Sequence, residues 1–261
     1  MNKAQIALSL GAIALILVLY QMPRVVVENE TIVDAAGQTH TFSIPQEVRT
    51  QISTLRSMWG KEADIEKKAN FADSLAGLYL DYQELDSVIW FVDFIKESDK
   101  EGREVRIADL LYRAFQRTST AEDSKRLGKL AGDELRSLLE QYPESSSLKN
   151  RLAMTLVVTD NPMQGIQLLR ELVEENPNDL EAIKNLGILS IQSGQFARAE
   201  DRFTELLKMD STDLEAKFYL GMSRIEQGNE EGYEIMEELS KIDINPAIQQ
   251  LAMQYLVEKD I

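Results

Sequence analysis

The chain has 261 residues, 44% of them apolar, with 28 basic side chains, 44 acidic ones, no cysteine and one histidine. This length allows a substantial hydrophobic core, while the missing cysteine excludes disulfides and thiolate chemistry, and one histidine disfavours a Ser-His-Asp triad or a multi-histidine metal site. The net charge of −16 argues against binding nucleic acid or anionic lipid through phosphates, so we expect no enzyme, no cofactor, no metal and no nucleic-acid partner.

The first element is a run of 20 uncharged residues from Ala4 to Pro23. As a helix it is roughly 30 Å long at about 1.5 Å per residue, which matches the hydrocarbon core of a bilayer. A cleaved secretory signal is the alternative, but the residues from Leu17 to Met22 are too large for a cleavage site. We therefore predict a short end at 1–3 followed by a transmembrane helix at 4–22.

The charges that flank this run predict its orientation. Lys3 and the amino terminus precede it and Arg24 follows it, which places the amino terminus in the cytoplasm by a small margin. We expect a single-pass protein of the inner (cell) membrane whose C-terminal domain lies in the periplasm.

Residues 23–60 are predicted to form a juxtamembrane linker. Its first part is rich in β-branched residues around Ala36-Gly37 and suggests a short hairpin or an extended tether. Pro45 then opens a predicted helix at 46–58, because proline suits a first helical position. His40 has no partner for catalysis or metal binding within sequence reach, so it is interpreted as an exposed loop residue.

From residue 61 onward, the chain repeats itself with a period of 34 residues. Asp179-Leu180-Glu181-Ala182 reappears as Asp213-Leu214-Glu215-Ala216. Further residues coincide at the same offset: Leu186 with Leu220, Gly187 with Gly221, and Gly194 with Gly228. Each period contains two amphipathic helical segments, so the chain is predicted to be an array of helix pairs.

A 34-residue period of two helices resembles the tetratricopeptide repeat (TPR) family. The unit 180–213 matches best, with Leu186-Gly187 in the first helix, Gly194 in the turn, and Ala199 and Phe203 in the second helix. Ser190 departs from the aromatic residue usual at its position, and Ser211 from the usual proline. The resemblance implies an all-α solenoid of helix-turn-helix repeats that binds proteins or peptides.

We expect this TPR domain to cover 61–261. The repeats fall at about 69–102, 103–145 (a degenerate unit), 146–179, 180–213 and 214–246, followed by a closing helix at 247–260. Residues predicted to pack the repeats together are Leu186, Gly187, Gly194, Ala199, Phe203, Leu220, Gly221 and Gly228.

The resemblance places the first helix of each repeat on a concave face where a partner binds. The candidate binding residues on that face are Met154, Val158, Lys184, Ile188, Ile191, Phe218, Met222 and Ile225. The alternative is that some of them are core residues, or that the closing helix occupies the groove. A clamp for the carboxyl tails of Hsp70 and Hsp90 is disfavoured, because only Asn185 fits its pattern and Glu215 would repel a carboxylate.

The most apolar stretch after the predicted anchor is 88–95, which reads Val-Ile-Trp-Phe-Val-Asp-Phe-Ile. A helix that is apolar nearly all round must be covered on both sides, by the rest of the fold or by another chain. Core burial is the favoured interpretation, and Trp90 marks the alternative, a homodimer.

Two functional hypotheses follow from this layout. The first is a membrane-anchored adaptor or scaffold with a chaperone-like role in the cell envelope; the layout resembles TPR proteins that attend the Sec translocon and those that present apocytochrome for haem ligation. The second is a structural subunit of a membrane-associated assembly, or a homodimer, with no separate client. From Pro143 onward there are 22 acidic and 11 basic residues, which favours a neutral or basic partner.

Overall fold

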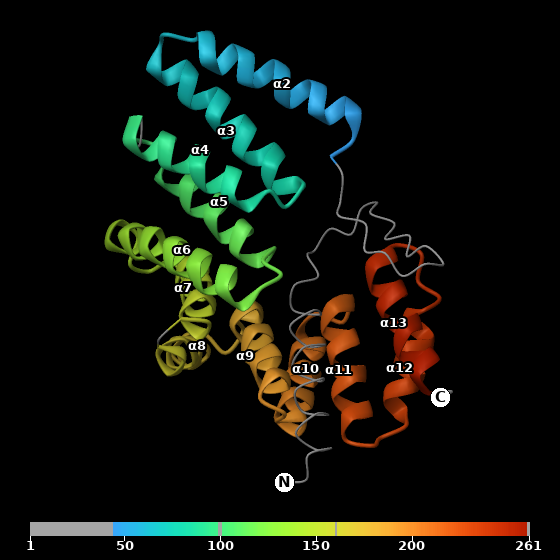
Figure 1. Ribbon diagram of the computed structural model, residues 1–261. Coiled ribbons are helices and arrows are strands. Elements are labelled where there is room, and N and C mark those ends of the chain that lie inside the picture. Colours follow the sequence, from blue (N-terminus) through green and yellow to red (C-terminus); the bar gives the residue numbers. More distant parts are fainter. Residues whose placement is uncertain (1–43, 99–100, 160, 260–261) are drawn as a thin grey trace. The chain divides into compact units, whose positions relative to one another are not determined.

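The computed structural model describes residues 44–98, 101–159 and 161–259. In these residues the chain is all α-helical, without strands, and divides into two compact units that contain α2–α7 and α8–α13 (Figure 1). The predicted transmembrane helix at 4–22, the first part of the linker and His40 lie outside the described residues. No helix in the described ranges is long and apolar enough to cross a membrane.

The first unit is a series of six helices. They are α2 (Gln46–Lys61), α3 (Ile65–Asp81), α4 (Leu85–Ser98), α5 (Glu104–Gln116), α6 (Ala121–Gln141) and α7 (Ser146–Val157). Each helix packs against the next one in the chain, as expected for stacked helix pairs. Its core contains Leu75, Phe91, Ile107, Phe115 and Leu135, all almost fully buried.

Helix α2 extends beyond its predicted end near Met58. Gly60 lies inside the helix, and the N–H of Glu62 bonds to the carbonyl of Met58 where the helix ends. Because α2 packs against α3 and buries Ile52, residues 46–61 form the first helical layer of this unit.

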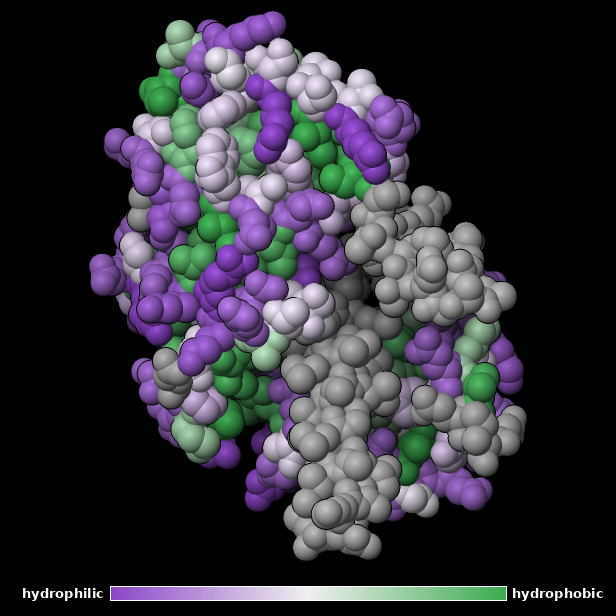
Figure 2. All heavy atoms as spheres, viewed as in Figure 1, coloured by the Kyte–Doolittle hydropathy of each residue, from purple (hydrophilic) through white to green (hydrophobic). Residues whose placement is uncertain are grey.

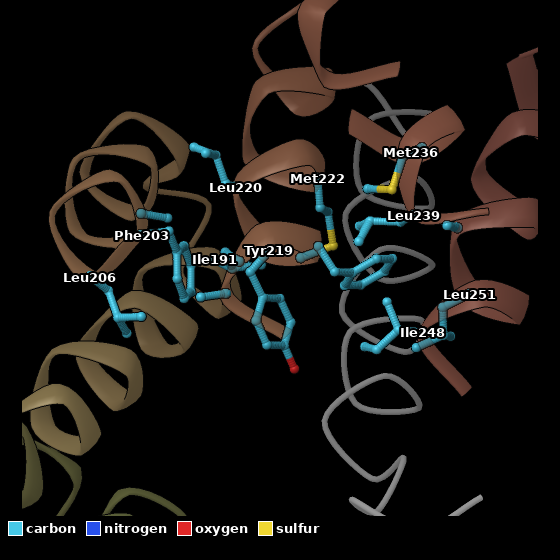
Figure 3. Close-up of a cluster of buried hydrophobic side chains, with 14 of the residues drawn as sticks. Ile191, Phe203, Leu206, Tyr219, Leu220, Met222, Met236, Leu239, Ile248 and Leu251 are labelled. Atoms are coloured by element: carbon cyan, nitrogen blue, oxygen red, sulfur yellow. The ribbon is translucent and has the colours of Figure 1, made fainter. Parts of the chain in front are cut away.

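The second unit also contains six helices. They are α8 (Pro162–Glu175), α9 (Leu180–Gln192), α10 (Phe196–Met209), α11 (Leu214–Glu226), α12 (Glu231–Leu239) and α13 (Pro246–Lys259). Here α9 to α13 pack in chain order, and α13 also contacts α11. Figure 3 shows the resulting core, in which Phe203 and Tyr219 lie beside one another with ring centroids 5.3 Å apart.

The 34-residue period has a local structural cause in this unit. Asp179 caps α9 by accepting a hydrogen bond from the backbone N–H of Ala182, and Asp213 caps α11 in the same way. Each of these helices is followed by a glycine with positive φ, Gly194 at 70° and Gly228 at 76°. Glycine adopts this conformation without strain, so both turns recur where the sequence repeats.

Among the predicted packing residues, Gly194 and Gly228 lie in turns, and the others lie on helices. Leu186, Ala199, Phe203 and Leu220 are buried. A Cβ atom at Gly187 would lie 2.7 Å from the ring of Phe203, which explains why this position carries a glycine. The structure therefore shows a helical-repeat fold in this part of the chain.

Replacing Asp179 with alanine is expected to lower the free energy of unfolding by about 1 kcal/mol, because the N–H of Ala182 loses its 2.9 Å acceptor. Urea denaturation followed by circular dichroism measures the change. Asp179→Asn is the matched control, since asparagine is an equally good cap without the charge. Equal losses in both variants would assign the effect to the charge instead of the cap.

Candidate protein-binding site

The predicted concave face is largely closed in the structure. Ile191, Phe218 and Met222 are each 2% exposed and belong to the hydrophobic core of the second unit. The ring of Phe218 lies 5.7 Å from that of Tyr255 on α13, edge to face. The expectation of exposed side chains at these positions is therefore corrected: the closing helix packs here, as the alternative interpretation proposed.

The remaining predicted residues of the second unit pack against neighbouring helices too. Ile188 and Ile225 are half-buried, and Ile225 fits against Gly232 of α12. The Nζ of Lys184 lies 2.5 Å from Asp213 and 3.1 Å from Glu215, which ties α9 to α11. Burial by itself lowers the pKa of Lys184, but these two carboxylates outweigh it and raise the pKa overall.

The two predicted residues of the first unit show the same pattern. Met154 is buried on α7, and Val158, just after that helix, lies against Gly128 of α6. The prediction that Met154 lies on an accessible binding face is therefore corrected as well. Helix α7 packs against α6, and the Met154 side chain is part of the core.

An open cavity occurs instead at the other end of the first unit, between α2 and α4. Its volume is about 490 Å³, within the range of small-ligand pockets. The residues that line it are Arg56, Trp59, Gly60, Asp86, Ser87, Trp90 and Phe91. Figure 2 shows hydrophobic residues at the surface among hydrophilic ones over this part of the molecule.

Helix α4 explains why the cavity has aromatic walls. Val88, Phe91, Val92 and Ile95 recur at helical spacing and are buried in the core. Trp90 points to another side and is 52% exposed. The apolar run at 88–95 therefore has two roles, since one side fills the core and the other supplies a wall of the cavity.

The aromatic rings around the cavity contact one another. The ring centroid of Trp59 lies 5.4 Å from that of Trp90 and 5.3 Å from that of Phe94, both edge to face. Trp90 also stacks on Phe94 at 6.4 Å. Such pairs fix ring orientation, so the walls are preformed.

Charged groups surround these rings. The guanidinium of Arg56 lies 5.5 Å from the ring centroid of Tyr79 and 5.9 Å from that of Phe91, within range of a cation–π interaction. The carboxylate of Asp86 lies 2.7 Å from Arg126, and this hydrogen bond is the main reason why the pKa of Arg126 is raised. No metal-binding cluster of histidine or carboxylate side chains occurs in the described ranges.

The sequence indicates only one of the two tryptophans of this site. Trp90 marks the predicted homodimer contact, whereas Trp59 falls within the segment 23–60 that is predicted to be a linker. The available signal was compositional: the chain has two tryptophans, and both line this cavity.

No protein-family model and no curated protein matches this sequence. Two solved structures with similar folds are YrrB, a TPR protein with an unusual peptide-binding site, and the assembly chaperone of RpL4 (Acl4), residues 1–338. YrrB is 23% identical, with 78% of this chain and 98% of YrrB covered and a TM-score of 0.41. Acl4 is 18% identical, with 84% of this chain and 98% of the other covered, also with a TM-score of 0.41. These similarities concern the helical fold alone.

Proposed function

We propose that this chain is a membrane-anchored TPR-type adaptor that binds another protein and acts in a chaperone-like way in the cell envelope. Its activity is binding, without catalysis. The anchor is the apolar segment 4–22, and the flanking charges favour a periplasmic location for the helical domain. The excess of acidic residues favours a partner that is neutral or basic overall.

The observation that carries this proposal is the half-exposed Trp90 at the mouth of a preformed aromatic cavity. Covering the exposed half of a tryptophan side chain contributes about 2–3 kcal/mol at about 25 cal/mol per Å². Tryptophan and arginine are the residues that most often dominate binding energy at protein interfaces, and both line this cavity. The site therefore suits an apolar side chain of a protein partner.

The second candidate function is a structural homodimer, and the same exposed Trp90 favours it. Two copies could cover each other's cavities through an isologous contact. The mass of a cross-linked product separates this arrangement from an adaptor with a different partner.

A photoreactive residue placed at Ser87 in the full-length chain tests the proposal in living cells. We expect a cross-linked product with a different protein, and we expect Trp90→Ala to abolish it. The matched control is the same probe at Val105, which is 60% exposed but does not line the cavity. A product of twice the chain's own mass would favour the homodimer, and no product at Ser87 would contradict both functions for this site.

A further inference from the structure

Two hydrogen-bond donors without acceptors belong to residues that line the α2–α4 cavity. Trp59 Nε1 is the buried side-chain polar atom that lacks a partner within the described ranges. No carboxylate of the described residues pairs with Arg56, which interacts with the rings of Tyr79 and Phe91 instead. A buried donor without an acceptor costs free energy, so a ligand that brings an acceptor is favoured here.

The cavity lining contains one cation, Arg56, and one anion, Asp86, although the chain as a whole is acidic. Asp86 is 85% exposed and pairs with Arg126, which also pairs with Asp123. Arg56 keeps its charge available, and Lys68 adds a second cation 4.8 Å from the ring centroid of Trp59. Because the chain's own cations already occupy these aromatic faces, a cationic ligand is disfavoured and an anionic one is favoured.

We propose that this cavity binds the C-terminal residue of a partner chain, with its apolar side chain against Trp59 and Trp90 and its α-carboxylate on Arg56. This inference rests on the proposed adaptor function and specifies its partner. A C-terminal residue carries the apolar group and the carboxylate on the same Cα, which matches one cavity that offers both kinds of contact. The partner's overall charge can still be neutral or basic, since only one carboxylate is required.

One side chain holds the carboxylate in this arrangement. The guanidinium of Arg56 offers the planar fork that binds a carboxylate through two parallel hydrogen bonds. The ring of Trp59, held by its pairs with Trp90 and Phe94, lies beside the bound apolar side chain. Binding therefore changes the environment of the Trp59 indole.

The test uses the full-length chain with ¹⁵N-labelled tryptophan, whose two indole N–H signals are assigned with Trp90→Phe. Three probes are titrated: N-acetyl-phenylalanine, its C-terminal amide, and N-acetyl-glutamate α-amide. We expect N-acetyl-phenylalanine to shift the Trp59 signal and to bind about tenfold more tightly than either amide, because a hydrogen bond to a charged group contributes more than a neutral one.

Arg56→Gln is expected to reduce binding of N-acetyl-phenylalanine to the level of its amide, and Arg56→Lys to restore it only in part, since lysine lacks the fork. Arg49→Gln is the matched control, because Arg49 is exposed on the same helix and does not line the cavity. Equal affinity for the acid and amide probes, tighter binding of the glutamate probe, or no binding of any probe overturns the inference. If the cross-link at Ser87 persists in that case, the adaptor function stands and only the C-terminal specificity is lost.

Discussion

Lys96→Ala is expected to lower the free energy of unfolding of the first unit by about 3 kcal/mol, because it removes a cation that lies against a buried carboxylate. The Nζ of Lys96 on α4 lies 2.6 Å from Glu134 on α6. The Glu134 side chain is only 8% exposed, while that of Lys96 is 28% exposed. The partial exposure of Lys96 places the loss at the lower end of the range for broken buried pairs.

Urea denaturation followed by tryptophan fluorescence measures this change selectively. Trp59 and Trp90 are the only tryptophans in the chain, and both lie in the first unit, so the signal reports on the unit that contains the ion pair. Arg136→Ala is the matched control, since Arg136 pairs with Asp133 on the same helix at 2.8 Å but both side chains are about half exposed. Its loss should stay below about 0.5 kcal/mol.

The double variant Lys96→Met/Glu134→Leu separates the effect of the charges on stability from the effect of side-chain packing. Replacing both partners of a buried pair by apolar residues of similar volume is often neutral, so we expect stability within about 1 kcal/mol of the parent chain. A Lys96→Ala loss no larger than that of Arg136→Ala would show that water reaches Glu134 and that the pair is not buried in solution.

The helical-repeat fold was largely predictable, because its signals are local. An aspartate that caps a helix and a glycine that ends it act within a few residues of the chain, as at Asp213 and Gly228. Repetition of these signals at an interval of 34 residues then marks the helix pairs. Within the degenerate unit predicted at 103–145, the structure contains α5 at Glu104–Gln116 and α6 at Ala121–Gln141.

The candidate site depends on contacts that no local signal encodes. Trp59 and Trp90 meet because α2 and α4 lie close together around the cavity, and neither helical periodicity nor repeat register predicts that contact. The prediction of an accessible groove around Phe218 differs from the structure for a related reason. The repeat predicts that Phe218 lies on the first helix of its unit. Whether α13 covers Phe218 depends on how that last helix packs, which the repeat does not predict.

Gly232→Ala is expected to destabilise the second unit by about 3 kcal/mol, at the upper end of the usual cost of overpacking. A Cβ atom at this position would lie 2.5 Å from the carbonyl oxygen of Gly221 and 2.8 Å from the backbone nitrogen of Ile225. Both are backbone atoms of α11, so no side chain can rotate to relieve the contact, and α12 must move away from α11 as a whole.

Gly60→Ala is the control for the substitution itself, because no atom lies within 4 Å of a Cβ at that helical position. Alanine has a higher helix propensity than glycine, so Gly60→Ala should be neutral or stabilise α2 by up to about 1 kcal/mol. Tryptophan fluorescence does not report on the second unit, so circular dichroism and hydrogen exchange of α11 and α12 are the measurements. The absence of a side chain at Gly232 sets the distance between α11 and α12. If the amides of these helices exchanged as slowly in Gly232→Ala as in the parent chain, the two helices would have to lie farther apart than they do in the structure. The close approach of Ile225 to α12 would then be incorrect as well, since the same contact positions both residues.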